Sequence, residues 1–577
     1  MLNIIPLPKK IEIHEGFLRE KKVRFINDIK DVRILKALKY FEIDDNGVSV
    51  EISIGNKQRE AYSIEIKKDN IVINADCNAG AFYAIQTLRQ IFVSEEVPCC
   101  YIMDEPDFKY RGFYHDITRG KIPKVETIKN LIDDMAYYKL NSLQLYVEHT
   151  YEFEEYADSI ERTGFITSEE LKEIDEYCRM NFIELVPSLS TFGHLYELLQ
   201  KTKYKHLQTI DTFETKPFFW ENRMSHHTID PTRAESFEII KSLIDQYIVN
   251  FSSDKFNICC DETFDLEKGK HKNEDTGKLY VDFVTKIVKY LQNKGKTVMM
   301  WADILLKHPD RIDDLSKDVE LLNWDYWDKP DENSFKLIHD ANVKQIVCPG
   351  TGSWSRLCED YEMEIVNIGK MVEFGYKYGA EGVLNTNWGD WGNPCCIELA
   401  MFGLVLGAAK SWNVSTTVDD HYIKSVNRLL YKSEGANEYI KRLSLLCREV
   451  SWYTLAMVYA NIVCGKEVYD IKFPEKDILL KSVEESFGLI KDISAEKWEE
   501  EKYREQILIT AEGLAVMAEI IAICAGYSVE RKTDTKKWID KYKEKWMLYN
   551  KESEYAEIEK MFLMTENYAK NICAEQQ

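Results

Sequence analysis

The first part of the chain alternates apolar and polar positions in short runs. Residues 62–67 and 71–75 show this period of two, which is typical of half-buried strands. An amphipathic helical pattern over residues 80–92 closes the region. The pattern predicts a small N-terminal α+β domain over residues 1–105.

A different pattern begins after the turn-rich segment DEPDF at residues 104–108. Short apolar runs, each the length of a buried strand, alternate with helical stretches such as 125–140, 168–181 and 233–251. Eight βα units over residues 106–412 fit a closed (β/α)₈ TIM barrel better than an open doubly wound sheet. The expected strands are residues 111–117, 142–148, 183–190, 255–261, 297–303, 319–326, 343–350 and 381–388.

The strand pattern stops after Trp412, and residues 413–577 show long amphipathic helical periods, for example over 504–525 and 536–550. We therefore expect an all-helical C-terminal domain. Its expected role is to pack against the barrel or to form a homodimer.

Composition limits the classes of partner. A hydrophobic fraction of 45% with 30% charged residues indicates a globular protein, and the formal charge of −23 argues against nucleic acid or an anionic membrane as a partner. The fourteen cysteines lack paired CxxC zinc spacing, and the first residues lack the pattern of an export signal. We expect free thiols, a reducing cytoplasmic location and a neutral or cationic ligand.

Candidate chemistry lies where the expected strands end, because barrels of this class build their active sites at the C-terminal ends of the strands. A ring of carboxylates interspersed with tryptophans suits a sugar, whose hydroxyls need acceptors and whose CH faces pack on aromatic rings. The residues at these ends are Asp116, Arg119, Glu148, His149, His194, Asp261, Glu262, Trp301, Asp303, Trp324, Tyr326, Trp327, Trp354, Trp388 and Asp390.

Asp261 and Glu262 follow the strand pattern KFNICC. Neighbours in a strand point to opposite faces, so both carboxylates can reach one ligand only if the chain leaves strand geometry there. Two acids at a barrel mouth are candidates for general acid and base catalysis.

Four sequence features together resemble glycoside hydrolase family 20, the β-N-acetylhexosaminidases, over roughly the first 410 positions. The chain resembles a divergent, intracellular branch of this family. The four features are GAFYAIQTLRQIF at residues 80–92, RGFYHDITRGKIP with MAYYKLNSLQL within residues 111–145, CCDE ending at Glu262, and NWGDWGNP from Asn387. The sequence departs from the family pattern at Cys259 and Cys260, which replace the usual glycines, and at Glu148 and His149 after the second strand.

The resemblance implies an exo-acting, retaining, substrate-assisted hydrolase of glycans with a terminal β-linked N-acetylglucosamine or N-acetylgalactosamine, without cofactor or metal. The acetamido oxygen of the substrate would attack the anomeric carbon and form an oxazolinium ion. Glu262 would protonate the leaving oxygen and then activate water, while Asp261 would hold the acetamido N–H.

The resemblance also implies a substrate-binding set. Arg119 would bind O3 and O4, Asp390 would bind O4 and O6 of either epimer, and Trp301, Trp324 and Trp388 would line the acetamido pocket. The seventh loop offers Trp354 where the family has a tyrosine, so Tyr326 becomes the candidate donor to the acetamido oxygen. His194 and Glu148 complete the set.

Two other readings remain open. One is a metal-dependent hydrolase with His149, His194, Asp261 and Asp303 as ligands, although no HxH or HExxH pattern supports it. The other is a sugar-binding protein that has lost catalysis.

Overall fold

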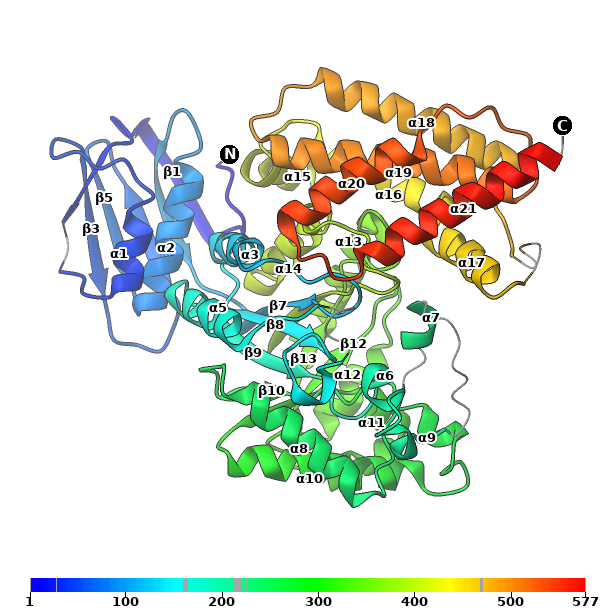
Figure 1. Ribbon diagram of the computed structural model, residues 1–577. Helices are drawn as coiled ribbons and strands as arrows, with labels where there is room; N and C mark the ends of the chain where they lie inside the picture. Colours follow the sequence, from blue (N-terminus) through cyan, green and yellow to red (C-terminus); the bar gives the residue numbers. More distant parts are fainter. Residues whose placement is uncertain are drawn as a thin grey trace.

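The computed structural model describes residues 2–26, 28–158, 164–210, 220–224, 227–466, 468 and 471–575. A mixed sheet, a closed barrel and a group of long helices follow one another along the chain (Figure 1). This arrangement confirms the predicted fold class.

The N-terminal sheet has strand order β1-β6-β4-β5-β3-β2. Helix α2 packs against this sheet through contacts with β3, β4 and β5, and α1 packs against α2. Alternate residues of β4 and β5 are buried, which is why their sequences show a period of two. The elements are β1 (Lys10–Phe17), β2 (Val23–Ile26), α1 (Val32–Leu38), β3 (Val48–Ile54), β4 (Tyr62–Ile66), β5 (Asn70–Ala75), α2 (Asn78–Ile91) and β6 (Pro98–Asp104).

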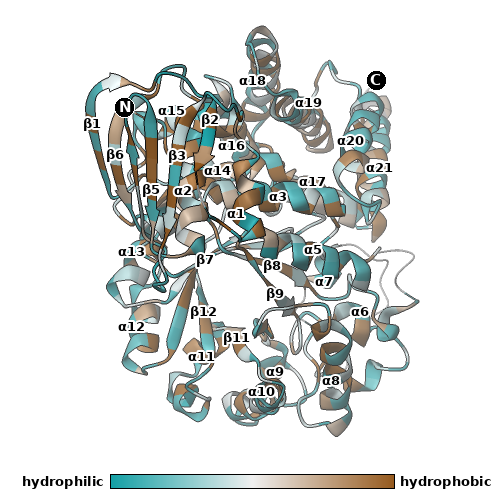
Figure 2. Ribbon diagram, turned by 90° about the vertical axis from the view of Figure 1, so that its left-hand side faces the viewer, coloured by the Kyte–Doolittle hydropathy of each residue, from teal (hydrophilic) through white to brown (hydrophobic). Residues whose placement is uncertain are grey.

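Eight parallel strands close the barrel, and strands such as β8 and β14 are buried at every position, which explains the apolar runs in the sequence. Figure 2 colours these strands by hydropathy. All eight predicted strands are present. The strands are β7 (Tyr110–Asp116), β8 (Ser142–Val147), β9 (Glu184–Leu189), β10 (Lys255–Asn257), β11 (Thr297–Trp301), β12 (Glu320–Trp324), β13 (Lys344–Cys348) and β14 (Gly382–Asn387).

Helices surround the barrel and fill the connections between strands. A capping box formed by Thr167 and Glu170 begins α5, and the Asp275 carboxylate caps the first turn of α10. The longer helices are α3 (Val125–Tyr137), α5 (Ser168–Met180), α8 (Ala234–Ile248), α10 (Thr276–Asn293), α12 (Glu332–Asp340), α13 (Tyr361–Lys377) and α14 (Met401–Trp412). Short helices near the mouth are α6 (Tyr196–Leu199), α7 (Trp220–Arg223), α9 (Asp265–Lys268) and α11 (Asp303–Lys307).

The C-terminal helices pack around α19 (Glu501–Cys524), which contacts α16, α17, α18, α20 and α21. Among the described residues, α19 alone is long and apolar enough to cross a membrane, but 89% of its most apolar window is buried inside the protein. Its apolar side chains therefore form the core of this region. The other helices of this region are α15 (Asp420–Val426), α16 (Ala436–Glu449), α17 (Trp452–Val463), α18 (Lys476–Ala495), α20 (Thr535–Tyr549) and α21 (Tyr555–Glu575).

Candidate active site

The candidate catalytic carboxylates lie where the chain turns out of β10. This strand ends at Asn257, four residues before its predicted end, because Cys259 and Cys260 adopt positive φ angles of 56° and 65°. Glu262 also has a positive φ, of 50°. The left-handed conformation is costly for side chains other than glycine, so the surrounding structure must hold it in place. The turn brings both carboxylates to one side, as the sequence required.

Hydrogen bonds from three side chains hold this turn. The Asn257 side chain accepts from the Cys259 N–H at 2.9 Å, and the Thr191 hydroxyl donates to the Ile258 carbonyl at 2.7 Å. The Tyr280 hydroxyl donates to the Cys260 carbonyl at 2.9 Å. Each bond satisfies a backbone group that left the sheet, which stabilises the strained conformation.

His194 lies between the two carboxylates. Its Nε2 is 3.4 Å from Asp261 Oδ2 and 3.3 Å from Glu262 Oε2. Burial disfavours the imidazolium, but the two carboxylates outweigh this effect and raise the pKa of His194 to about 10. The group therefore holds a proton beside Glu262 throughout the neutral pH range.

Asp303, at the start of α11, supports the pair from the other side. Its Oδ2 accepts the Glu262 N–H at 3.0 Å. Burial and the nearby charge of Asp261 raise the pKa of Asp303 to about 7. The sequence predicts Asp303 only as a strand-end residue and a possible metal ligand. The sequence signal for its role in holding Glu262 is its position two residues after Trp301, at the end of β11.

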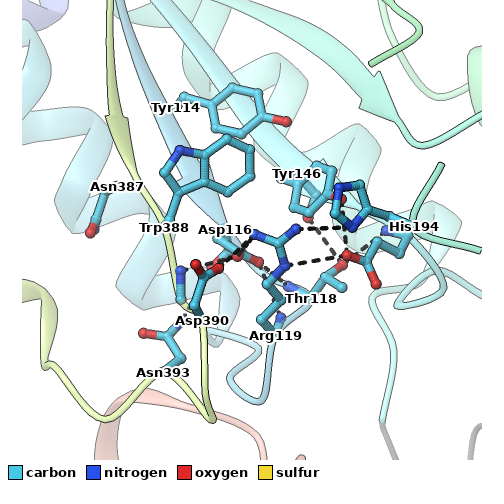
Figure 3. Close-up of polar contacts among 12 residues, drawn as sticks. Tyr114, Asp116, Thr118, Arg119, Tyr146, His194, Asn387, Trp388, Asp390 and Asn393 are labelled. Carbon is cyan, nitrogen blue, oxygen red and sulfur yellow. Dashed lines mark hydrogen bonds and ion pairs between the residues drawn. The ribbon is translucent and has the colours of Figure 1, made fainter. Parts of the chain in front are cut away.

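Arg119 joins the second group of polar residues (Figure 3). Its Nη1 is 2.7 Å from Asp390 Oδ1, and its Nε is 3.3 Å from Glu148 Oε1. Arg119 is buried, and the charges around it hold the pKa of its guanidinium above the usual range, despite desolvation. Burial raises the pKa of both Glu148 and Asp390, and Arg119 opposes this effect.

Asp116 fixes the backbone that carries Arg119, a role that the sequence did not reveal. Its Oδ1 accepts the N–H groups of Thr118 and Arg119 at 2.8 and 3.1 Å, and its Oδ2 accepts the Gly389 N–H at 3.0 Å. One buried carboxylate thus joins the loop after β7 to the loop after β14, so that Arg119 and Asp390 face each other (Figure 3).

The predicted aromatic residues form one continuous wall. The Trp388 indole N–H donates to the Tyr326 hydroxyl at 2.7 Å, and its ring centroid is 5.7 Å from that of Trp301. Tyr326 stacks on Trp324 at 5.0 Å and lies 5.2 Å from Trp354. Tyr114, which we did not predict, lies 5.2 Å from Trp301 and 4.9 Å from Trp388. Trp301 is fully buried, so it supports the wall from inside the barrel.

The candidate metal-binding cluster in the structure differs from the one predicted from the sequence. Within the described ranges, the one group of side chains close enough to share an ion is His194, Asp261 and Glu262, without His149 or Asp303. His194 Nε2 faces the two carboxylates, whereas its Nδ1 lies 3.4 Å from Arg119 Nη2. The imidazolium supplies the positive charge between the carboxylates.

The site therefore combines a protonated carboxylate–histidine group, an arginine with two carboxylate partners, and an aromatic wall. All eleven residues that we predicted belong to this assembly. Such a site can supply a general acid, orient sugar hydroxyls and pack against an apolar sugar face.

Comparisons with sequence families and known structures show which proteins this chain resembles. Residues 108–355 match the model described as glycosyl hydrolase family 20, catalytic domain, and residues 1–105 match its domain 2. A beta-hexosaminidase of Porphyromonas gingivalis is 27% identical over 360 residues, which cover 53% of this chain and 46% of that protein. A beta-hexosaminidase of Vibrio vulnificus is 23% identical over 301 residues, which cover 42% and 35%. The chain thus matches less than half the length of these two relatives.

The similarity in fold extends further. The X-ray structure of the Flavobacterium johnsoniae chitobiase superposes with a TM-score of 0.61 at 18% identity, covering 93% of this chain and 96% of that one. This overlap includes the C-terminal helices as well as the barrel.

Proposed function

Since this chain belongs to glycosyl hydrolase family 20, we propose that it is an exo-acting β-N-acetylhexosaminidase that cleaves terminal β-linked N-acetylhexosamine by a substrate-assisted, retaining mechanism. One observation carries the proposal. Asp261 Oδ2 faces His194, whereas its buried Oδ1 has no hydrogen-bond partner among the described residues. This oxygen is available to accept the acetamido N–H of a substrate next to Glu262.

In the first step, the acetamido oxygen attacks the anomeric carbon as the bond to the leaving oxygen breaks. Glu262 gives its proton to that oxygen, and the sugar becomes an oxazolinium ion. Asp261 accepts the acetamido N–H and stabilises the positive charge that spreads onto this group. Glu262 receives its proton from His194, whose Nε2 lies 3.3 Å from Glu262 Oε2.

In the second step, Glu262 takes a proton from water, and the water oxygen attacks the anomeric carbon. The oxazolinium ring opens, so the acetamido group is restored and the product keeps the β configuration. The glutamic acid is regenerated for the next cycle.

Arg119 and Asp390 provide the hydroxyl contacts in this proposal. Their 2.7 Å ion pair presents donors and an acceptor together, which suits neighbouring sugar hydroxyls. In the Trp388–Tyr326 bond the tyrosine oxygen is the acceptor, so the tyrosine O–H is the group that would donate to the acetamido oxygen. Either the gluco or the galacto epimer fits this donor and acceptor set.

The test compares wild type with Glu262→Gln and Asp261→Asn on aryl β-N-acetylglucosaminide and its galacto epimer. We expect both substitutions to lower kcat by about 10²–10⁴-fold, and a thiazoline mimic of the oxazolinium to inhibit the wild type. Glu267→Gln is the matched control, because this carboxylate lies in the next short helix with its side chain 50% exposed. Full activity of Glu262→Gln, or sugar binding by a wild type that hydrolyses neither substrate, would refute the proposal.

A further inference from the structure

The segment that joins α20 to α21 pairs with the chain that follows Arg119. The Lys551 N–H donates to the Ile122 carbonyl at 2.8 Å, and the Glu554 N–H donates to the Gly120 carbonyl at 3.2 Å. The Lys124 N–H donates in the other direction, to the Tyr549 carbonyl at 2.9 Å. The C-terminal region thus adds an antiparallel backbone ladder to the loop that carries Arg119.

Glu554 also reaches α7 across this interface. Its two carboxylate oxygens accept from Arg223 Nη1 at 3.0 Å and from Nη2 at 2.5 Å. Both side chains are only 2% exposed, and such a buried two-point pair has a fixed geometry. Arg223 Nη2 also lies 3.3 Å from Glu197, whose other oxygen accepts from Gln200 at 2.7 Å.

Arg223 acts in turn on Glu148. The charge of Arg223 lowers the pKa of Glu148, and Glu148 helps to raise the pKa of Arg223. Glu148 holds Arg119 Nε at 3.3 Å. A chain of alternating charges therefore runs from Glu554 in the C-terminal region through Arg223 and Glu148 to Arg119.

Close packing holds α7 in the place that this chain requires. A Cβ on Gly392 would lie 2.5 Å from the Trp220 ring, and a Cβ on Gly120 would lie 2.8 Å from the Gly392 backbone. Gly120 and Gly392 have positive φ angles of 110° and 92°, which glycine adopts without strain. Trp220 thus rests on the loop after β14, which rests on the loop after β7. In Figure 1, α7 lies on the side of the barrel that faces the C-terminal helices.

We propose that the C-terminal helices complete the active site, with Arg223 and Glu554 as positioning residues that hold Glu148 against Arg119. The proposal rests on the proposed function for the role of Arg119 in binding sugar hydroxyls. It gives the C-terminal region a part in substrate affinity in addition to packing.

The test separates this role from a purely structural one. Arg223→Met removes the guanidinium between the Glu554 and Glu197 carboxylates, and Glu554→Gln removes one of the two carboxylates at Arg223, so each single variant should lose stability. The double variant R223M/E554Q removes the Arg223–Glu554 pair together but keeps the charge of Glu197, so it should recover part of the stability. Glu566→Gln is the matched control. It removes the carboxylate that pairs with Arg531 at 2.5 Å, twelve residues further along the chain in α21, or about 18 Å of helix.

The readouts are the thermal midpoint, the KM of the aryl substrate and the Kd of the thiazoline mimic. We expect R223M/E554Q to raise KM and Kd about tenfold, with a smaller change in kcat because Glu262 is untouched. The increase should be larger at acid pH, because losing Arg223 raises the pKa of Glu148. Several charged groups act on Glu148: Arg119, His194 and Arg223 lower its pKa, and Asp116 raises it. Two further groups contact its carboxylate, because His149 Nδ1 lies 3.8 Å away and the Tyr146 hydroxyl donates a hydrogen bond at 2.9 Å.

Wild-type KM, Kd and pH profile in a folded double variant would overturn the proposal. So would an equal change in the Glu566→Gln control. The Kd arm needs no turnover, so loss of affinity without any hydrolysis in the wild type would sustain this inference while refuting the proposed function.

Discussion

Replacing Asp303 with asparagine should change the stability of the protein in a pH-dependent way. The asparagine Oδ1 can still accept the Glu262 N–H, which Asp303 accepts at 3.0 Å, so the turn keeps its hydrogen bond. What the variant loses is a carboxyl whose pKa rises to about 7 because of burial and the charge of Asp261. The substitution therefore removes the titrating carboxyl of Asp303 and keeps the hydrogen bond to the Glu262 N–H.

The sign follows from proton binding. The folded state keeps the Asp303 proton up to about pH 7, whereas a carboxyl in an unfolded chain loses it near pH 4. Between these values the folded state binds more protons, so wild-type stability falls as the pH rises and stays level above about pH 7. The full difference corresponds to about 4 kcal/mol, and because part of the side chain reaches solvent we expect about 2 kcal/mol.

The assay is the thermal midpoint of the barrel transition at pH 5 and pH 8. Between pH 5 and pH 8 about two thirds of this difference is sampled, so the thermal midpoint of Asp303→Asn should rise relative to that of the wild type by about 3 °C, at roughly 2 °C per kcal/mol. Asp313→Asn, at a side chain that is 82% exposed, is the control and should give the same small difference at both pH values. A gain of Asp303→Asn that does not change with pH would refute the reasoning.

Three further predictions follow from the site. Tyr326→Phe should lower kcat/KM about 10- to 100-fold, because it removes the donor to the acetamido oxygen and the acceptor of the Trp388 indole; unchanged turnover would refute the assignment. Gly392→Ala should raise KM and destabilise the protein by about 2 kcal/mol in thermal unfolding, because its Cβ would collide with Trp220. An unchanged thermal midpoint and KM would show that this contact is unimportant. Dialysis against EDTA should leave activity within about twofold, because the protonated His194 supplies the local positive charge; loss of activity that zinc restores would favour the metal reading.

Most of the barrel could be predicted because its strands are buried on both faces. Their apolar runs are short and bounded by polar loops, and seven of the eight end within two residues of the prediction. β10 is the exception, because the sequence KFNICC continues the apolar pattern while its backbone has already turned. Apolar pattern reports burial, and Cys259 and Cys260 are buried without being in a strand.

The site residues could be located because the carboxyl ends of barrel strands meet at one mouth. That rule gathers residues from distant parts of the sequence without any contact information. It does not distinguish residues that face the ligand from residues that hold them, so it predicts no positioning role for Asp116 or Asp303. Their roles depend on which backbone N–H groups they accept, namely those of Thr118, Arg119 and Glu262, among others.

The part played by the C-terminal helices could not be read from the sequence for a physical reason. The ladder between residues 120–124 and 549–554 uses backbone groups, which every residue type except proline can donate, so it leaves no side-chain motif. The Arg223–Glu554 pair joins positions 331 residues apart, and each partner alone resembles an ordinary surface charge. Only the fold shows that both are buried and that the charge of Arg223 acts on Glu148. The same physics implies that other sequences in this region could support the site equally well, provided that they place one carboxylate at the end of such a ladder.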